Sequence, residues 1–167
     1  MLDIVLSTEQ IHARVAELAA EIRRDHPDDL HVVAVLSGAF VFLADLVRQI
    51  PGDLTLDFIA VASYGSARTS SGEVRLLKDL DAAIEGRRVV IVEDIIETSA
   101  TLAYLKEALR ARNPRSLKVA CLLEKRREGA RGVTVDYVGF TIPDRFVVGY
   151  GLDYAQKYRN LPYIAAL

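Results

Sequence analysis

The chain has 167 residues, 51% of them hydrophobic and 26% charged, a balance typical of a globular protein, so one domain over residues 1–167 is expected. Its formal net charge of −2 does not predict a basic face for nucleic acid, and no apolar run is long enough to cross a bilayer. We therefore expect neither a nucleic-acid nor a membrane partner and, because no basic region precedes the first short apolar patch, a cytoplasmic location.

The first part of the chain predicts helices and strands in alternation. Ser7 and Gln10 have the spacing of a helix capping box. Apolar residues follow at helical spacing, at Ile11, Val15, Leu18 and Ile22. The apolar run 31–36 predicts a buried strand, and residues 39–50 predict a helix that ends before a Pro-Gly pair.

The remainder continues the same pattern. A long strand is predicted over 54–64, and a polar segment with several Ser and Gly residues follows over 65–75. Further strands are predicted over 87–94, 116–124, 135–140 and 145–154, and a helix over 101–112.

Buried strands that alternate with helices favour a parallel sheet covered on both faces, in a doubly wound α/β domain. In such sheets, ligands bind at the carboxyl ends of the strands. Segments 36–38, 93–94 and 124–125 fall at such ends and carry polar or charged residues. The sequence therefore predicts that these three segments meet at one site.

The stretch "VVIVEDIIETSATLAYL", residues 89–105, holds the most informative pattern. A buried strand ends at Glu93 and Asp94, and a cluster of hydroxyl residues then opens a helix. Free N–H groups at a helix start and nearby hydroxyls favour an anion, whereas the acids suit a neutral diol or a divalent cation. A sugar phosphate meets both demands. The alternative is an ordinary helix cap beside two solvated acids.

Other reactive residue types are less informative. Cys121 lies in the apolar run "LKVACLL" and is expected to be a buried small side chain rather than a catalytic thiol. The histidines at 12, 26 and 31 show no metal-ligand spacing and are expected at surface or packing positions.

The stretch "VVIVEDIIETSATL" resembles the phosphoribosyl-pyrophosphate motif of type I phosphoribosyltransferases. "SYGSARTSSGEVRLLKDL", "LLEKR", "VDYVGFTIPDRFVVGYGLDY" and "YRNLPYI" are similar to segments of the hypoxanthine-guanine phosphoribosyltransferases, in the same order. The resemblance implies a mostly parallel sheet flanked by helices, with a small C-terminal hood and a flexible lid. It also implies transfer of phosphoribose from 5-phosphoribosyl 1-pyrophosphate to hypoxanthine or guanine, giving IMP or GMP and pyrophosphate, with Mg²⁺ as cofactor. A homodimer or homotetramer is expected on the same ground.

The resemblance assigns residues to the sugar and phosphate groups. Glu93 and Asp94 match the acids that hold the ribose hydroxyls, and both are candidate metal ligands. Arg159 matches a pyrophosphate contact. The loop expected to bind the 5-phosphate consists of Thr98, Ser99, Ala100 and Thr101. The loop expected to grip pyrophosphate, which in this family often has a non-proline cis peptide bond, consists of Leu36, Ser37 and Gly38.

The purine side is assigned in the same way. Lys125 matches the lysine that donates to the purine 6-oxo group, Phe146 the stacking aromatic, and Val147 the residue whose backbone meets the purine edge. Asp153 matches a magnesium ligand. The lid begins at Ser63 and Tyr64.

Three positions depart from the family pattern. Glu97 stands where the family usually has the Asp proposed as general base for the N7 proton, Ser99 where it has Gly, and Ser37 where many relatives have Lys or Arg. The changes at Glu97 and Ser99 raise an alternative, a nucleotide-binding regulator on the same fold with weak or no turnover. The purine-side matches and the net charge disfavour an RNA-binding regulator.

Overall fold

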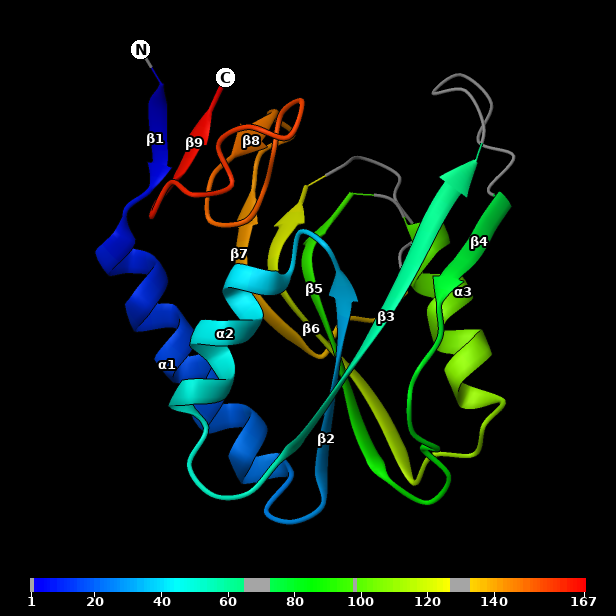
Figure 1. Cartoon of the computed structure of the whole chain (residues 1–167). Helices are drawn as coiled ribbons and strands as arrows, with labels where there is room; N and C mark the ends of the chain where they lie inside the picture. Colours follow the sequence, from blue (N-terminus) through cyan, green and yellow to red (C-terminus); the bar gives the residue numbers. More distant parts are fainter. Residues whose placement is uncertain (1, 65–72, 98, 127–132) are drawn as a thin grey trace.

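The structure, a computed structural model, describes residues 2–64, 73–97, 99–126 and 133–167, and only the backbone at positions 64, 73 and 99 (Figure 1). A six-stranded sheet of order β4-β3-β2-β5-β6-β7 forms its centre. The strands are β2 (Leu30–Leu36), β3 (Thr55–Tyr64), β4 (Glu73–Lys78), β5 (Arg88–Ile96), β6 (Ser116–Lys125) and β7 (Tyr137–Ile142). All neighbouring strands are parallel except β3 and β4, so the mostly parallel sheet predicted from sequence is confirmed.

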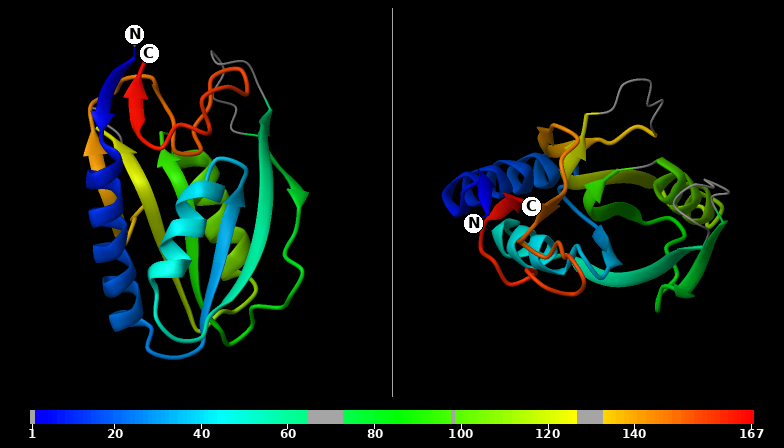
Figure 2. Two further views of the ribbon diagram at one scale, coloured as in Figure 1. Left: turned by 60° about the vertical axis from the view of Figure 1, so that its left-hand side comes forward. Right: turned by 90° about the horizontal axis from the view of Figure 1, so that it is seen from above.

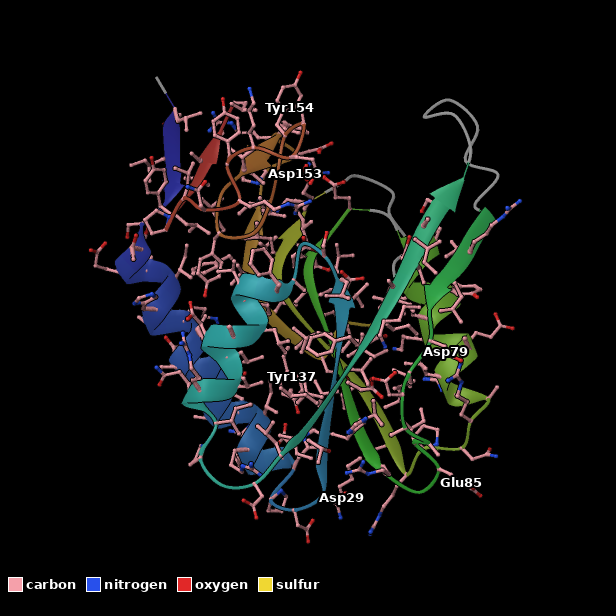
Figure 3. All side chains as sticks on the ribbon, viewed as in Figure 1. Asp29, Asp79, Glu85, Tyr137, Asp153 and Tyr154 are labelled. Atoms are coloured by element: carbon pink, nitrogen blue, oxygen red, sulfur yellow. The ribbon has the colours of Figure 1, made fainter. Side chains whose placement is uncertain are left out.

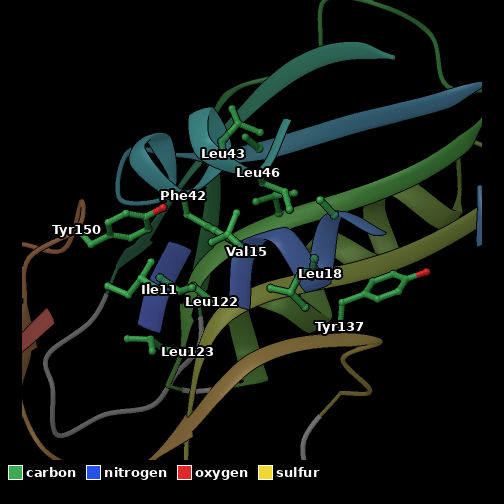
Figure 4. Packing of buried hydrophobic residues seen from close by; sticks show 14 of the residues in the cluster. Ile11, Val15, Leu18, Phe42, Leu43, Leu46, Leu122, Leu123, Tyr137 and Tyr150 are labelled. Carbon is green, nitrogen blue, oxygen red and sulfur yellow. The ribbon is translucent and has the colours of Figure 1, made fainter. Parts of the chain in front are cut away.

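Helices cover both faces of this sheet (Figure 2). Helices α1 (Thr8–Asp25) and α2 (Phe40–Gln49) pack on one face, where they form a core with β2, β5 and β6 (Figure 4). Helix α3 (Ser99–Arg110) packs on the other face through Leu102, Leu105 and Leu109. None of the helices in the described ranges is long and apolar enough to span a membrane.

The predicted start of α1 is confirmed. The Ser7 amide donates to Gln10 Oε1 at 2.8 Å, and the Gln10 amide donates to Ser7 Oγ at 3.1 Å, which satisfies two N–H groups at the helix start. The apolar positions predicted to face the core are buried: Ile11, Val15, Leu18 and Ile22.

A second, three-stranded sheet of order β1-β9-β8 forms the hood. It consists of β1 (Asp3–Leu6), β8 (Val147–Val148) and β9 (Ile164–Ala166), so the two ends of the chain lie side by side (Figure 1). The C-terminal hood is predicted from the sequence, whereas β1 and β9 are not.

Some predicted segments differ in the structure. Of the strand predicted over 145–154, only Val147 and Val148 form a strand; Gly149, Tyr150 and Gly151 then have φ angles of 98°, 52° and 96°, outside the β region. The last residues of the polar segment 65–75 belong to β4, and residues 65–72 of the expected lid lie outside the described residues.

Candidate functional site

The carboxyl ends of β2, β5 and β6 meet at the edge of the main sheet that faces the hood (Figure 1). Leu36 ends β2, Glu93 and Asp94 lie near the end of β5, and Lys125 ends β6. The peptide bond between Leu36 and Ser37 is cis. The structure thus brings the ends of these three strands to one edge of the sheet.

Two adjoining cavities of about 360 and 390 Å³ open at this edge. They share Gly38, Asp94, Ile95 and Glu97. Predicted site residues that line only the first cavity are Leu36, Ser63, Glu93 and Thr101. Those that line only the second are Ser37, Phe146, Val147, Asp153 and Arg159.

The two acids of β5 form a pair in which Glu93 is buried and Asp94 is partly buried. Glu93 is 8% exposed, and Asp94 Oδ1 accepts a hydrogen bond of 2.7 Å from the Ile95 amide. Burial raises the pKa of the Glu93 carboxyl well above its ordinary value, and the neighbouring Asp94 raises it further; burial also raises the pKa of Asp94. A pair of acids that resists carrying two negative charges suits hydroxyl donors or a cation.

The start of α3 contributes hydroxyl and N–H donors to the first cavity. Thr101 lines the cavity from the first turn of the helix, where N–H groups have no partner within the helix. Its Oγ1 lies 3.5 Å from Ser63 Oγ at the end of β3. This geometry favours an anion. Ala100 is exposed in the same turn, and Thr98 lies outside the described residues.

The loop after β8 forms a wall of the second cavity. Phe146 is 50% exposed, and its ring meets the Tyr154 ring edge-on at 5.7 Å between centroids, so ring surface remains open for stacking. Arg159 donates a hydrogen bond of 2.7 Å to the Gly151 carbonyl and lies 3.5 Å from Asp153 Oδ1. The charge of Arg159 therefore stays beside Asp153, at the hood end of the molecule (Figure 3).

Lys125 is buried at the end of β6, with a side chain only 5% exposed. Its Nζ lies 2.6 Å from Glu97 Oε1 and 3.7 Å from Asp144 Oδ1. Burying an ammonium group is costly unless partners offset the charge. Both the predicted base and the predicted purine-recognising lysine are thus present, and they contact each other.

A metal ion would need ligands beyond the protein. Among the described residues, no group of three or more Asp, Glu, His or Cys side chains is placed to hold a metal by itself. Asp153 lines the second cavity, Glu93 the first, and Asp94 both. These separate carboxylates fit Mg²⁺, which usually binds through one or two carboxylates together with water and substrate phosphates.

Sequence reasoning missed some residues of the site. Ile95 and Leu152 line the second cavity, and Asp144 lies beside Lys125. The strand predicted over 135–140 ends too early to bring Asp144 to the sheet edge, whereas β7 runs to Ile142, opposite Lys125. The position of Asp144 beside Lys125 depends on the register of β7 against β6, which no local pattern in the sequence reveals.

Residues 2–155 match the family described as phosphoribosyl transferase domain. The hypoxanthine-guanine phosphoribosyltransferase of Bacillus subtilis (strain 168) is 47% identical over 165 residues, covering 98% of this chain and 92% of that protein. The enzyme of the same name from Mycobacterium bovis is 49% identical over 171 residues, covering 98% of this chain and 85% of that protein. A crystal structure of a hypoxanthine-guanine phosphoribosyltransferase from Bacillus anthracis has a TM-score of 0.93 and 48% identity, covering 99% of this chain and 98% of that chain.

Proposed function

Because the chain belongs to the phosphoribosyl transferase family, we propose that it transfers phosphoribose from 5-phosphoribosyl 1-pyrophosphate to N9 of hypoxanthine or guanine. The products are IMP or GMP and pyrophosphate. The observation that carries the proposal is the pair of adjoining cavities that share Asp94 and Glu97. One cavity has the donors and acids that suit a sugar phosphate, and the other has an aromatic ring together with Glu97, which contacts the buried ammonium group of Lys125.

The first cavity binds the phosphoribosyl group. The 5-phosphate lies at the start of α3, where Thr101 and the free N–H groups of the first turn donate to it. The ribose hydroxyls donate to the carboxyl oxygens of Glu93 and Asp94, and burial raises the pKa of both groups. Thr98 and Ser99 complete the phosphate loop in this proposal.

The second cavity binds the purine. Phe146 stacks on the base, the backbone of Val147 meets its edge, and Lys125 donates to the 6-oxo group. Ammonium groups donate hydrogen bonds and cannot accept them. A 6-amino group would leave Lys125 facing another donor, so adenine is excluded.

In the reaction, purine N9 attacks C1′ of the ribose, and pyrophosphate leaves with the electrons of the broken C–O bond. The N7 proton passes to the Glu97 carboxylate. Ser37, Gly38 and Arg159, which line the second cavity, would bind the pyrophosphate. Asp153 would hold Mg²⁺, which neutralises charge on pyrophosphate when bound.

A nucleotide-binding regulator without turnover is the alternative that the changes at Glu97 and Ser99 raise. The curated relatives compared above are named as transferases, and Glu97 lines both cavities, where a base is needed. These observations favour the enzyme. A cytoplasmic location, one domain over residues 1–167 and a homodimer or homotetramer stay predictions.

The test is to incubate the protein with 5-phosphoribosyl 1-pyrophosphate, Mg²⁺ and either hypoxanthine or guanine, and to identify products by chromatography and mass spectrometry. We expect IMP or GMP and one pyrophosphate for each nucleotide formed. Controls lack the purine or the metal. Nucleotide binding without any product would support the regulator instead.

A further inference from the structure

The 2.6 Å contact between Lys125 Nζ and Glu97 Oε1 follows from the register of the sheet. β5 and β6 run parallel with Ile96, the last residue of β5, opposite Glu124, so Glu97 just past the end of β5 lies near Lys125, the last residue of β6. On the other side of β6, Lys125 pairs with Ile142 of β7, and Asp144 follows shortly after. The buried ammonium group therefore has a carboxylate on each side.

The two carboxylates contact Lys125 to different degrees. Glu97 is within hydrogen-bond distance, whereas Asp144 Oδ1 lies at 3.7 Å; their side chains are 48% and 52% exposed. An aspartate at position 97 would be shorter by one C–C bond, roughly 1.5 Å. From the same backbone it could not reach Lys125 at hydrogen-bond distance. The close contact thus depends on the longer side chain that distinguishes this chain from the family pattern.

Resting on the function proposed above, we propose that the 6-oxopurine and Glu97 exchange places on Lys125. In the protein without substrate, the Glu97 carboxylate contacts the Lys125 ammonium group, which the purine 6-oxo group must reach. When the purine enters, its 6-oxo group accepts the hydrogen bond from Lys125, and the released Glu97 carboxylate turns to the purine N7. Asp144 stays beside Lys125 and keeps its charge partly paired throughout.

The exchange makes recognition of the purine and release of the general base, Glu97, a single event. When the purine has an acceptor at C6, that oxygen replaces the Glu97 carboxylate as the partner of the Lys125 ammonium group. A purine with an amino group at C6 offers no acceptor at that position. The contact between Glu97 and Lys125 then persists, and the Glu97 carboxylate does not reach N7. Glu97 is then a determinant of purine affinity as well as a proton acceptor, and Asp144 is a positioning residue for Lys125.

The test separates purine affinity from chemistry in Glu97→Asp. Single-turnover rates of IMP formation are measured at saturating 5-phosphoribosyl 1-pyrophosphate and varied hypoxanthine. The hypoxanthine concentration that gives half the maximal rate, called half-saturation below, reports purine affinity. The maximal rate, called the plateau, reports the chemical step. With the competing contact removed and a carboxylate retained, half-saturation should fall about threefold to tenfold, the size of one partly exposed charged hydrogen bond. The plateau reports any change in the chemical step separately, so the exchange is judged on the half-saturating hypoxanthine concentration alone.

Two further variants give independent readouts. Glu97→Gln weakens the contact and removes the base, so half-saturation and plateau should both fall. Asp144→Asn leaves Lys125 less well paired after the exchange, so half-saturation should rise, by about threefold, while the plateau holds. Asp28→Asn, which removes an exposed carboxylate at the opposite end of the sheet, is the matched control and should change neither.

The outcomes are distinguishable. If the wild-type protein forms IMP but half-saturation for hypoxanthine is unchanged or higher in both Glu97 variants, the exchange is wrong and the proposed function stands. If the wild-type protein forms no nucleotide, the proposed function fails, and the exchange with it. Melting temperatures establish that each variant is folded, and half-saturation for 5-phosphoribosyl 1-pyrophosphate should be unchanged in all of them.

Discussion

Replacing Gly38 by Ala should disable the site while leaving the protein folded. A β-carbon at this position would lie 2.9 Å from Asp94 Cγ, with a carboxylate oxygen closer still. Ordinary carbon–carbon contacts are about 3.5–4.0 Å, so Asp94 or the loop must move by roughly 1 Å. The Ile95 amide holds Asp94 in place, and Gly151 packs against the Gly38 carbonyl, so neither side can yield freely.

The magnitude follows from that displacement. A misplacement of about 1 Å in a catalytic site can cost about 100-fold in rate, and overpacking typically costs about 1–3 kcal/mol of unfolding free energy. We therefore expect kcat/KM for 5-phosphoribosyl 1-pyrophosphate to fall about 100-fold in Gly38→Ala. The melting temperature should fall by roughly 2–4 °C for each kcal/mol lost.

The assay is steady-state pyrophosphate release, with thermal melting of the same samples. Gly86→Ala is the matched control: Gly86 lies beside Glu85 at the opposite end of the sheet (Figure 3), has φ 72° and has no atom within 4 Å of an added β-carbon. Alanine in this conformation costs about 1–2 kcal/mol, so stability should fall and activity should not. A folded Gly38→Ala protein with kcat/KM within about threefold of wild type would refute the reasoning.

Three further predictions address the base, the metal and pH. Glu97→Gln should slow the chemical step at least about tenfold, with affinity for 5-phosphoribosyl 1-pyrophosphate nearly unchanged, because general base assistance is lost while the phosphate contacts remain. Single-turnover rates and binding constants check this, and unchanged chemistry would mean that the proton leaves by another route. Asp153→Asn should reduce activity at limiting Mg²⁺ far more than it lowers the melting temperature; wild-type activity at limiting Mg²⁺ would contradict the metal role. Burial, and then the charge of Arg87, lower the pKa of His31 below its ordinary value of 6.5. The unfolded chain therefore takes up this proton before the folded protein does, and His31 makes the free energy of unfolding fall as the pH drops below 6.5, levelling off below the lowered pKa. The difference in unfolding free energy between wild type and His31→Asn should shrink from about pH 7.5 to about pH 5, and a difference independent of pH would contradict the prediction.

The main sheet and the acidic end of β5 could be predicted from sequence because their signals are local. A run of β-branched residues predicts a buried strand, and the two acids that follow it fall at the carboxyl edge where ligands bind. The capping box at Ser7 and Gln10 likewise depends on residues close in sequence. The location of Glu93 and Asp94 in the site followed directly.

Features that depend on pairing between distant segments could not be predicted. β1 pairs with β9 from the opposite end of the chain, and neither short strand has a periodic pattern that identifies it. The contact between Glu97 and Lys125 depends on the register of β5 against β6, and that between Lys125 and Asp144 on the register of β6 against β7. Register is set by the packing of the whole sheet rather than by the residues beside the site.

The most direct test of the proposed activity is the ratio of kcat/KM for hypoxanthine to that for adenine in the same pyrophosphate-release assay. Lys125 beside the purine cavity predicts that hypoxanthine is preferred by orders of magnitude, since adenine would leave the buried ammonium group facing another donor. In Lys125→Met the ratio should collapse, mainly through loss of activity with hypoxanthine. A wild-type ratio below about ten, equivalent to only about 1.4 kcal/mol, would contradict the assignment of this site to 6-oxopurines.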